Sequence, residues 1–491
     1  MNKMKIDAGN ENPENSITIR LSELLYLLFF GIMLFAKGIG LYDGQNIYKI
    51  FLVLAFLCIA LKMCITEYSV KEWAVILFLL ALSVVVYRVS GEKGVLICMT
   101  MIVAMKNVSL KRSFGVGLTV WAIAVSGRFL FSLFFIENVE TAVQTKNIFG
   151  AVLRYFMGFP HPNVLHISYL ILTAFVIYCL KETYSFKHLA LLLLGNLFLF
   201  FYSYSFTGAL IVTLYICLSY YVKKRTIHKF EYFLVMLVFP GCILFSVIFP
   251  IILQGEAFEL ADKIFNNRIH LAKHFLTLEN MSLLGNNLAS ITTEIVAMDN
   301  SYLFILVTYG IPVFTLMCMG YMVTVSSYVK QKKNIELAMI CCFLVAGLTE
   351  PFLFNTSFKN LTLLFIGEQF FTELNKRKEE KRIALLGQCD RNIVIDLGRF
   401  KEIMKRWQEL WCKHRAIILK AGAAAAFIIS IVTGIIYQPR EDVLKVQRDN
   451  LLVYERVRVA GTAFVLGFAI AGIALIAFLM FAEIRKNKQG D

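Results

Sequence analysis

The sequence predicts an all-α polytopic integral membrane protein, with about twelve core transmembrane helices, a C-terminal appendage of two more and two long extracytoplasmic loops. The 491-residue chain has a mean hydropathy of +0.68, and 17% of its residues are charged, whereas soluble domains average about 25%. Apolar runs of roughly 20 residues, the length that crosses a bilayer, recur from one end to the other. Because lipid offers no water to satisfy backbone groups, these runs are expected to be helices.

The core spans begin at Leu21. They are expected at about 21–41, 46–65, 73–89, 94–107, 113–136, 164–181, 187–204, 207–222, 230–253, 302–329, 335–354 and 359–373. Two further spans are expected at about 416–437 and 459–483. The first run has no small-residue cleavage site and is long enough to span, so it is interpreted as an anchor and not as a removed signal peptide.

Basic residues set the expected orientation. The net charge of +15 comes mainly from Lys and Arg in short connections between apolar runs, which the positive-inside rule places in the cytoplasm. With both termini cytoplasmic, clusters such as Lys223/Lys224/Arg225 and Lys376/Arg377/Lys378 all face inside. Such charge favours anionic lipids or phosphate-bearing lipid substrates, and no nucleic-acid partner is expected.

This orientation divides the chain into four parts. Residues 1–20 form a disordered cytoplasmic tail, 21–373 the transmembrane core, 374–413 a basic and partly helical cytoplasmic linker, and 414–491 a transmembrane hairpin of unknown role. The two long outer loops are 137–163 and 254–300. None of the eleven cysteines falls in a predicted outer loop, and neither CxxC nor a zinc-ligand spacing occurs, so disulfides and metals are not expected.

The second outer loop carries the most informative cation. Apolar residues recur at helical spacing from Phe258 to Leu278, which predicts an amphipathic helix. Arg268 falls on the apolar stripe, and no carboxylate stands three or four residues away. Its guanidinium either snorkels to a polar boundary or meets an anion at the membrane surface. His270 and His274, one turn apart, lack a third ligand at helical spacing, which disfavours a metal site.

The first outer loop contains LRYFMGFPHPNVLH, from Leu153 to His166. His161 lies between two prolines, which restrict the local backbone. Its imidazole is either a general base near neutral pH or an incidental residue in a turn. Arg154, seven residues upstream, either binds phosphate or anchors the chain at the interface.

Further polar groups lie at the ends of spans or inside them. Asp299 and Asn300 immediately precede the tenth span and its Tyr302, where they suit a helix cap as well as substrate binding. Lys37, Arg128 and Glu350 fall within predicted spans, so each needs a partner or a wet cavity. Arg128 and Glu350 form a possible structural pair, or either lines a substrate cavity.

Together these segments resemble the bacterial O-antigen and capsular polysaccharide polymerases, the Wzy-type members of the O-antigen ligase superfamily. The resemblance covers about residues 20–373. It is carried by Arg268, by Glu350 near the end of a late span and by three motifs in the same order: GFPHPN at Gly158–Asn163, LLGNN at Leu283–Asn287 and DNSYLFILVTYGI at Asp299–Ile311.

The resemblance implies a metal-independent glycosyltransferase without cofactors in the cytoplasmic membrane. It would join undecaprenyl-diphosphate-linked oligosaccharides into O-antigen, capsular polysaccharide or exopolysaccharide at the outer face, with flippase and chain-length-regulator proteins as partners. Arg268 would stabilise the departing diphosphate and His161 would take the acceptor's proton. The candidate substrate-binding residues are Lys37, Arg128, Arg154, Asn163, Asp299, Asn300, Tyr302 and Glu350.

The sequence departs from the family at one expected phosphate contact. Many relatives carry Ser-Arg where this chain has Ser205-Phe206, so Arg154 or Lys37 would have to replace that arginine. Residues 374–491 also lie outside the family pattern. Three other functions stay open: a ligase that moves finished glycan to another acceptor, a flippase for lipid-linked sugars, and a non-catalytic membrane assembly partner.

Overall fold

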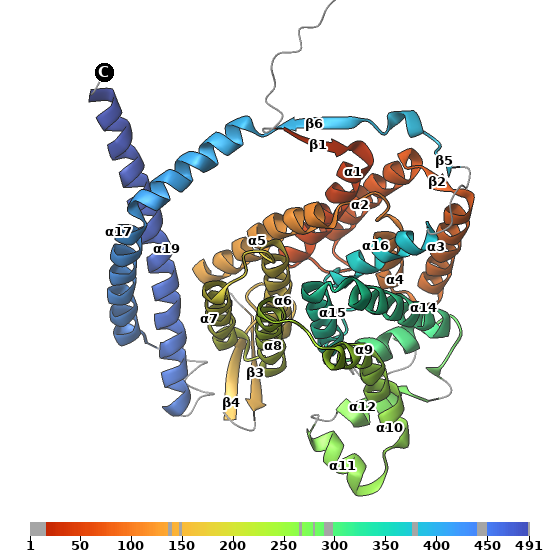
Figure 1. Cartoon of the computed structure of the whole chain (residues 1–491). Helices are drawn as coiled ribbons and strands as arrows, with labels where there is room; N and C mark the ends of the chain where they lie inside the picture. Colours follow the sequence, from red (N-terminus) through yellow and green to blue (C-terminus); the bar gives the residue numbers. More distant parts are fainter. Residues whose placement is uncertain are drawn as a thin grey trace, which may run out of the picture. The chain divides into compact units, whose positions relative to one another are not determined.

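The computed structural model describes residues 16–135, 140–146, 150–264, 268–277, 280–288, 298–375, 382–438 and 449–489. Within these ranges eleven helices are long and apolar enough to cross a membrane, nine of them between residues 21 and 331 and two in the C-terminal part. The prediction of an all-α fold with many apolar helices of membrane-spanning length is therefore confirmed (Figure 1).

The chain divides into two compact units, and the larger contains residues 21–140 and 156–391. Its first half comprises α1 (Leu21–Gly38), α2 (Asn46–Ile65), α3 (Val70–Ser90), α4 (Gly94–Val103), α5 (Leu110–Phe134), α6 (Pro162–Cys179), α7 (Phe186–Ser203) and α8 (Phe206–Lys224). Its second half comprises α9 (Lys229–Ile243), a π-helical turn (Leu244–Ile248), α10 (Phe249–Ile252), α11 (Gly255–Ile264), α12 (Arg268–Phe275), α14 (Ser301–Gln331), α15 (Asn334–Ala346) and α16 (Thr362–Leu374). Short strands β2 (Tyr68–Ser69) and β5 (Arg382–Ile383) pair with each other, and a 3-10 turn covers Gly387–Cys389.

Aromatic packing among α5, α6 and α16 forms a central part of the core. The ring of Phe114 stacks on Tyr178 at a centroid distance of 3.7 Å and on Phe365 at 5.6 Å, and it meets Phe175 edge to face. Gly117 lets Phe175 approach α5, because a Cβ there would overlap the phenyl ring. Such contacts fix the helices that support the loops described below.

Three predicted spans are shorter than expected. The helices at 94–107, 335–354 and 359–373 are α4, α15 and α16, of 10, 13 and 13 residues. Thirteen residues of α-helix rise about 20 Å, less than the roughly 30 Å of a hydrocarbon core. The residues that follow α15 form a loop, 347–361, which carries Glu350.

The LLGNN motif packs against a break in α14. Gly310 has a φ of +80° inside the helix, and Pro312 follows it. Gly285 has a φ of +83°, and a Cβ there would overlap the Thr308 carbonyl. The amide of Asn286 donates to the carbonyls of Asn280 and Val307, at 2.6 and 3.2 Å. The motif therefore has a packing role, in which glycines let the two backbones meet.

The smaller unit contains residues 1–20, 141–155 and 392–491. Strand β1 (Ser16–Arg20) pairs antiparallel with β6 (Asn392–Asp396), and β3 (Thr141–Lys146) pairs with β4 (Gly150–Tyr155). Helices α17 (Gly398–Ile436) and α19 (Asp449–Gln489) lie side by side (Figure 1). The expectation of a wholly disordered tail is wrong for residues 16–20, because they form β1. The loop expected at 137–163 contains the β3–β4 hairpin, which the sequence did not predict.

Candidate functional site

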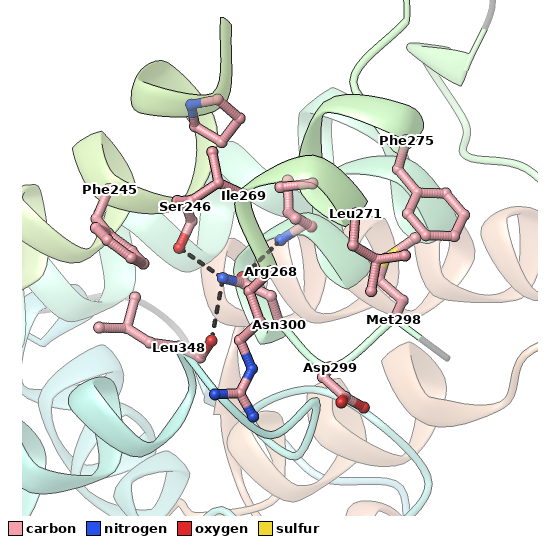
Figure 2. A pocket seen from close by; sticks show the side chains of 13 residues that line it. Phe245, Ser246, Arg268, Ile269, Leu271, Phe275, Met298, Asp299, Asn300 and Leu348 are labelled. Atoms are coloured by element: carbon pink, nitrogen blue, oxygen red, sulfur yellow. Dashed lines mark hydrogen bonds between the residues drawn. The ribbon is translucent and has the colours of Figure 1, made fainter. Parts of the chain in front are cut away.

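Arg268 is the first residue of α12, and it lines a small pocket with the π-helical turn, the start of α14 and Leu348 (Figure 2). The structure describes the expected helical stretch as two elements, α11 up to Ile264 and α12 from Arg268, while residues 265–267 and Leu278 lie outside the described residues. The apolar face of α12 packs through Ile269, Ala272 and Phe275, which are buried. This packing holds the first turn of α12, and with it Arg268, against the pocket.

Two carboxylates from distant segments act on Arg268. Figure 2 shows the guanidinium of Arg268 and the carboxylate of Asp299 on the same side of the pocket. Partial burial raises the pKa of Asp299, and the positive charge of Arg268 opposes this increase. The positive charge of Arg268 also opposes the increase in the pKa of Glu350. The sequence-based view of an isolated cation missed both carboxylates, because they lie 31 and 82 residues further along the chain.

Asn300 ties three segments together and confirms the predicted helix cap. Its Oδ1 accepts from the backbone N–H groups of Tyr302 and Leu303, at 2.9 and 3.2 Å. Its Nδ2 donates to Ser246 Oγ at 2.9 Å and to the Leu348 carbonyl at 3.3 Å, as drawn in Figure 2. With its amide committed in this way, Asn300 positions the pocket walls.

Glu350 is the most perturbed carboxyl near this pocket. Burial, followed by the charge of Asp299, raises its pKa to about 7; the Asn163 hydrogen bond, Arg268 and Lys359 oppose the rise. Asn163 Nδ2 donates to Glu350 Oε1 at 2.9 Å. Ser301, the first residue of α14, fixes the 347–361 loop, because its hydroxyl donates to the Glu350 carbonyl at 2.6 Å. A carboxyl with this pKa exchanges a proton near neutral pH.

The GFPHPN motif builds the approach to Glu350. Gly158 has a φ of +78°, and a Cβ there would overlap the guanidinium of Arg128. Arg128 donates through Nε and Nη2 to the Gly158 carbonyl, at 3.1 and 3.0 Å. Pro162 starts α6, where its missing N–H costs nothing, and this start directs Asn163 to Glu350. Arg128 therefore does not pair with Glu350 as the sequence suggested.

His161 is the N-cap of α6. Its Nδ1 accepts the backbone N–H of Asn163 at 3.1 Å. A neutral imidazole that accepts at Nδ1 carries its proton on Nε2, so the ring is arranged as a donor. A role as general base would require this cap to break. The geometry favours Glu350, and not His161, as the group that accepts a proton.

Three other predicted site residues have separate surroundings. Tyr302 is fully buried, and its hydroxyl donates to the Leu344 carbonyl at 2.8 Å, which is a packing role. Arg154 belongs to β4 in the smaller unit, where it is buried and donates to Gln144 Oε1 at 2.8 Å. Lys37 is buried in the last turn of α1, and its ammonium lies 3.7 Å from the ring centroid of Tyr48.

Arg128 lines a second cavity of about 460 Å³ in the larger unit. Phe131, Phe156 and Phe159 contribute aromatic rings to it, and Gln45 and Ser132 contribute polar groups. A wall of aromatic rings with a few polar groups is typical of a small-molecule site. Sequence reasoning missed this cavity because its lining residues come from three separate stretches of the chain.

No group of three metal-binding side chains occurs among the described residues. Comparison with protein-family models, curated proteins and solved structures gives no match for this chain. The functional argument therefore depends on the geometry of Arg268, Asp299, Glu350 and Asn163, and on the short motifs that position them.

Proposed function

We propose that this protein transfers a glycan from its lipid diphosphate to a hydroxyl of a second lipid-linked unit, and so polymerises oligosaccharide repeat units at the outer face of the cytoplasmic membrane. The observation that carries the proposal is that the charge of Arg268 acts on Glu350, a carboxyl held by Asn163 in a buried setting that raises its pKa to about 7. Transfer from a diphosphate needs both groups: one to stabilise the leaving anion and one to accept a proton.

The reaction forms one bond and breaks another at the anomeric carbon of the donor. The acceptor hydroxyl oxygen attacks this carbon, the bond to the diphosphate oxygen breaks, and the lipid diphosphate leaves with the electron pair. Glu350 accepts the hydroxyl proton, while the guanidinium of Arg268 binds two oxygens of the leaving diphosphate. The lipid diphosphate already activates the donor, so the step requires no cofactor.

The aromatic cavity next to Gly158 supports a carbohydrate substrate. Sugar rings present apolar C–H faces and hydroxyl edges, which match aromatic walls with a few polar groups. The LLGNN motif and Tyr302 support the scaffold instead, because their contacts are internal to the protein.

Deletion of the gene tests the proposal. Cells without this protein are expected to keep single lipid-linked repeat units at the outer face and to lack long glycan. Long glycan that is made normally but not attached to its final acceptor would favour the ligase. Lipid-linked units that fail to reach the outer face would favour the flippase. Either result would refute polymerisation.

A further inference from the structure

A third cavity, of about 150 Å³, collects two buried lysines. Lys37 comes from the last turn of α1, and Lys359 from the loop between α15 and α16. The same cavity is lined by Asn355, Thr356 and Ser357 of that loop and by Asp43. Gly40, Tyr42, Phe159 and Pro160 border both this cavity and the aromatic one, so the two adjoin.

Both lysines lack a directly bonded anionic partner within the described part of the chain. Lys37 is 7% exposed and Lys359 is 5% exposed; the Lys37 ammonium lies over the Tyr48 ring, and neither ammonium makes a hydrogen bond or ion pair with a described residue. The nearby carboxylate of Asp43 is engaged elsewhere, since both its oxygens lie 2.9 Å from Lys93 Nζ. Two buried cations without bound anions are costly, which points to a ligand that supplies the missing charge.

An unsatisfied hydroxyl lines the same cavity. Ser357 Oγ is buried and has no hydrogen-bond partner among the described residues, although most buried polar atoms have one. Two ammonium groups and one hydroxyl together offer several donors to a multiply charged oxyanion. A phosphate or diphosphate meets this description better than a single carboxylate, because it brings more negative charge and more acceptor oxygens.

We propose that the Lys37–Lys359 cavity binds the diphosphate of the acceptor, the second lipid-linked substrate. This inference rests on the proposed function, in which donor and acceptor both carry a lipid diphosphate. Glu350 interacts electrostatically with Arg268 and also with Lys359. The proton-accepting carboxyl would therefore act between two anion sites, one for each substrate.

The charge of Lys359 makes binding pH-dependent. Burial lowers the pKa of Lys359 to about 7. The negative charge of Glu350 opposes this decrease, and the positive charge of Lys37 adds to it. An anion binds the protonated form, so affinity is expected to fall as the pH rises from 6.5 to 8.5, by up to about tenfold per unit above the pKa. Asp43 also lines the cavity and pairs with Lys93, and the charges of both residues act on Lys37.

The test measures binding of inorganic pyrophosphate to the purified full-length protein by calorimetry at pH 6.5. The Arg268→Ala variant is expected to retain one saturable site. Adding Lys37→Met and Lys359→Met should weaken that site by at least about tenfold for each ammonium group removed. Lys49→Met is the matched control, because Lys49 is exposed on α2 and does not line the cavity.

Farnesyl diphosphate then distinguishes a lipid headgroup from a free anion. Displacement of pyrophosphate by this short lipid diphosphate supports an acceptor site, whereas binding of pyrophosphate alone overturns it. Displacement by equimolar glucuronate would also overturn the proposal, since the site would then recognise an acidic sugar. Loss of all pyrophosphate binding in Arg268→Ala alone would show that the lysine cavity binds no diphosphate.

Stability provides a second readout that does not depend on polymerisation. Lys359→Met removes a buried charge that has no bound anion, so it should raise the thermal unfolding midpoint while it weakens pyrophosphate binding. A lower midpoint would mean that Lys359 is a structural cation and would overturn the proposal. These binding results do not depend on glycan length in cells, so failure of the proposed function would appear separately, in the gene deletion.

Discussion

Replacing Glu350 by glutamine should stabilise the protein at alkaline pH and abolish its activity. The pKa of Glu350 is raised from its ordinary value of 4.5 to about 7. Between these two pH values the folded protein holds a proton on Glu350 that the unfolded chain has already released. Stability therefore decreases as the pH rises through this window, and the decrease is complete above pH 7. The amide introduced by Glu350→Gln mimics the protonated carboxyl, and its carbonyl can still accept from Asn163.

The expected size of this effect follows from the pKa. A rise from 4.5 to about 7 corresponds to about 3 kcal/mol at the alkaline end of the window, an upper bound because the side chain retains some solvent contact. Glu350→Gln should recover most of this at pH 8 and almost none at pH 4.5. The proposed transfer should require the ionised form, so wild-type activity should rise through about pH 7.

The assay combines thermal unfolding of the purified protein at several pH values with glycan length in complemented cells. Glu259→Gln is the control, because Glu259 is an exposed carboxylate on α11 and should change neither measurement. Equal stability of wild type and Glu350→Gln at pH 8 would refute the buried-carboxyl reasoning. Normal polymer from a stable Glu350→Gln variant would refute the role as proton acceptor.

Three further predictions concern the site and its orientation. Arg268→Lys keeps the charge but loses the contact of one guanidinium with two phosphate oxygens, so it should shorten the glycan strongly at unchanged protein abundance. Arg268→Ala should reduce transfer by about a hundredfold or more. Glycan of normal length from Arg268→Ala would show that Arg268 has no role in transfer. Gly158 has a φ of +78°, and the Cβ added by Gly158→Ala would overlap the guanidinium of Arg128. Thermal unfolding should therefore show a destabilisation of about 2–4 kcal/mol. An unchanged unfolding midpoint would contradict the close contact between Gly158 and Arg128. A single cysteine at Thr145 in a cysteine-free background should react with an impermeant thiol reagent on intact cells, whereas restored Cys389 should react only after lysis; the reverse pattern would invert the topology.

The helical class was readable from the sequence because a bilayer imposes it locally. Apolar length and the need to satisfy backbone hydrogen bonds act on each segment separately. The cap at Asn300 was also predicted, since capping depends on a few adjacent residues. The motifs around Arg268 and Glu350 indicated residues whose charges interact in the fold, although the two lie 82 positions apart.

The partners of individual charges were not readable. The proposed Arg128–Glu350 pair was wrong because opposite charge alone does not determine distance; Arg128 instead meets the Gly158 carbonyl. Lys359 was overlooked because it is the first residue of the span expected at 359–373, and only tertiary packing buries it beside Lys37.

The pairing of β1 with β6 sets a parity rule for membrane crossings. Two hydrogen-bonded strands lie on the same side of a bilayer, so the chain between Arg20 and Asn392 must cross it an even number of times. The described residues of this interval contain nine long apolar helices, which is an odd number. If each of them crosses, an odd number of additional crossings must come from the shorter helices α4, α15 and α16. These three therefore cannot all be re-entrant segments that return to the side from which they came.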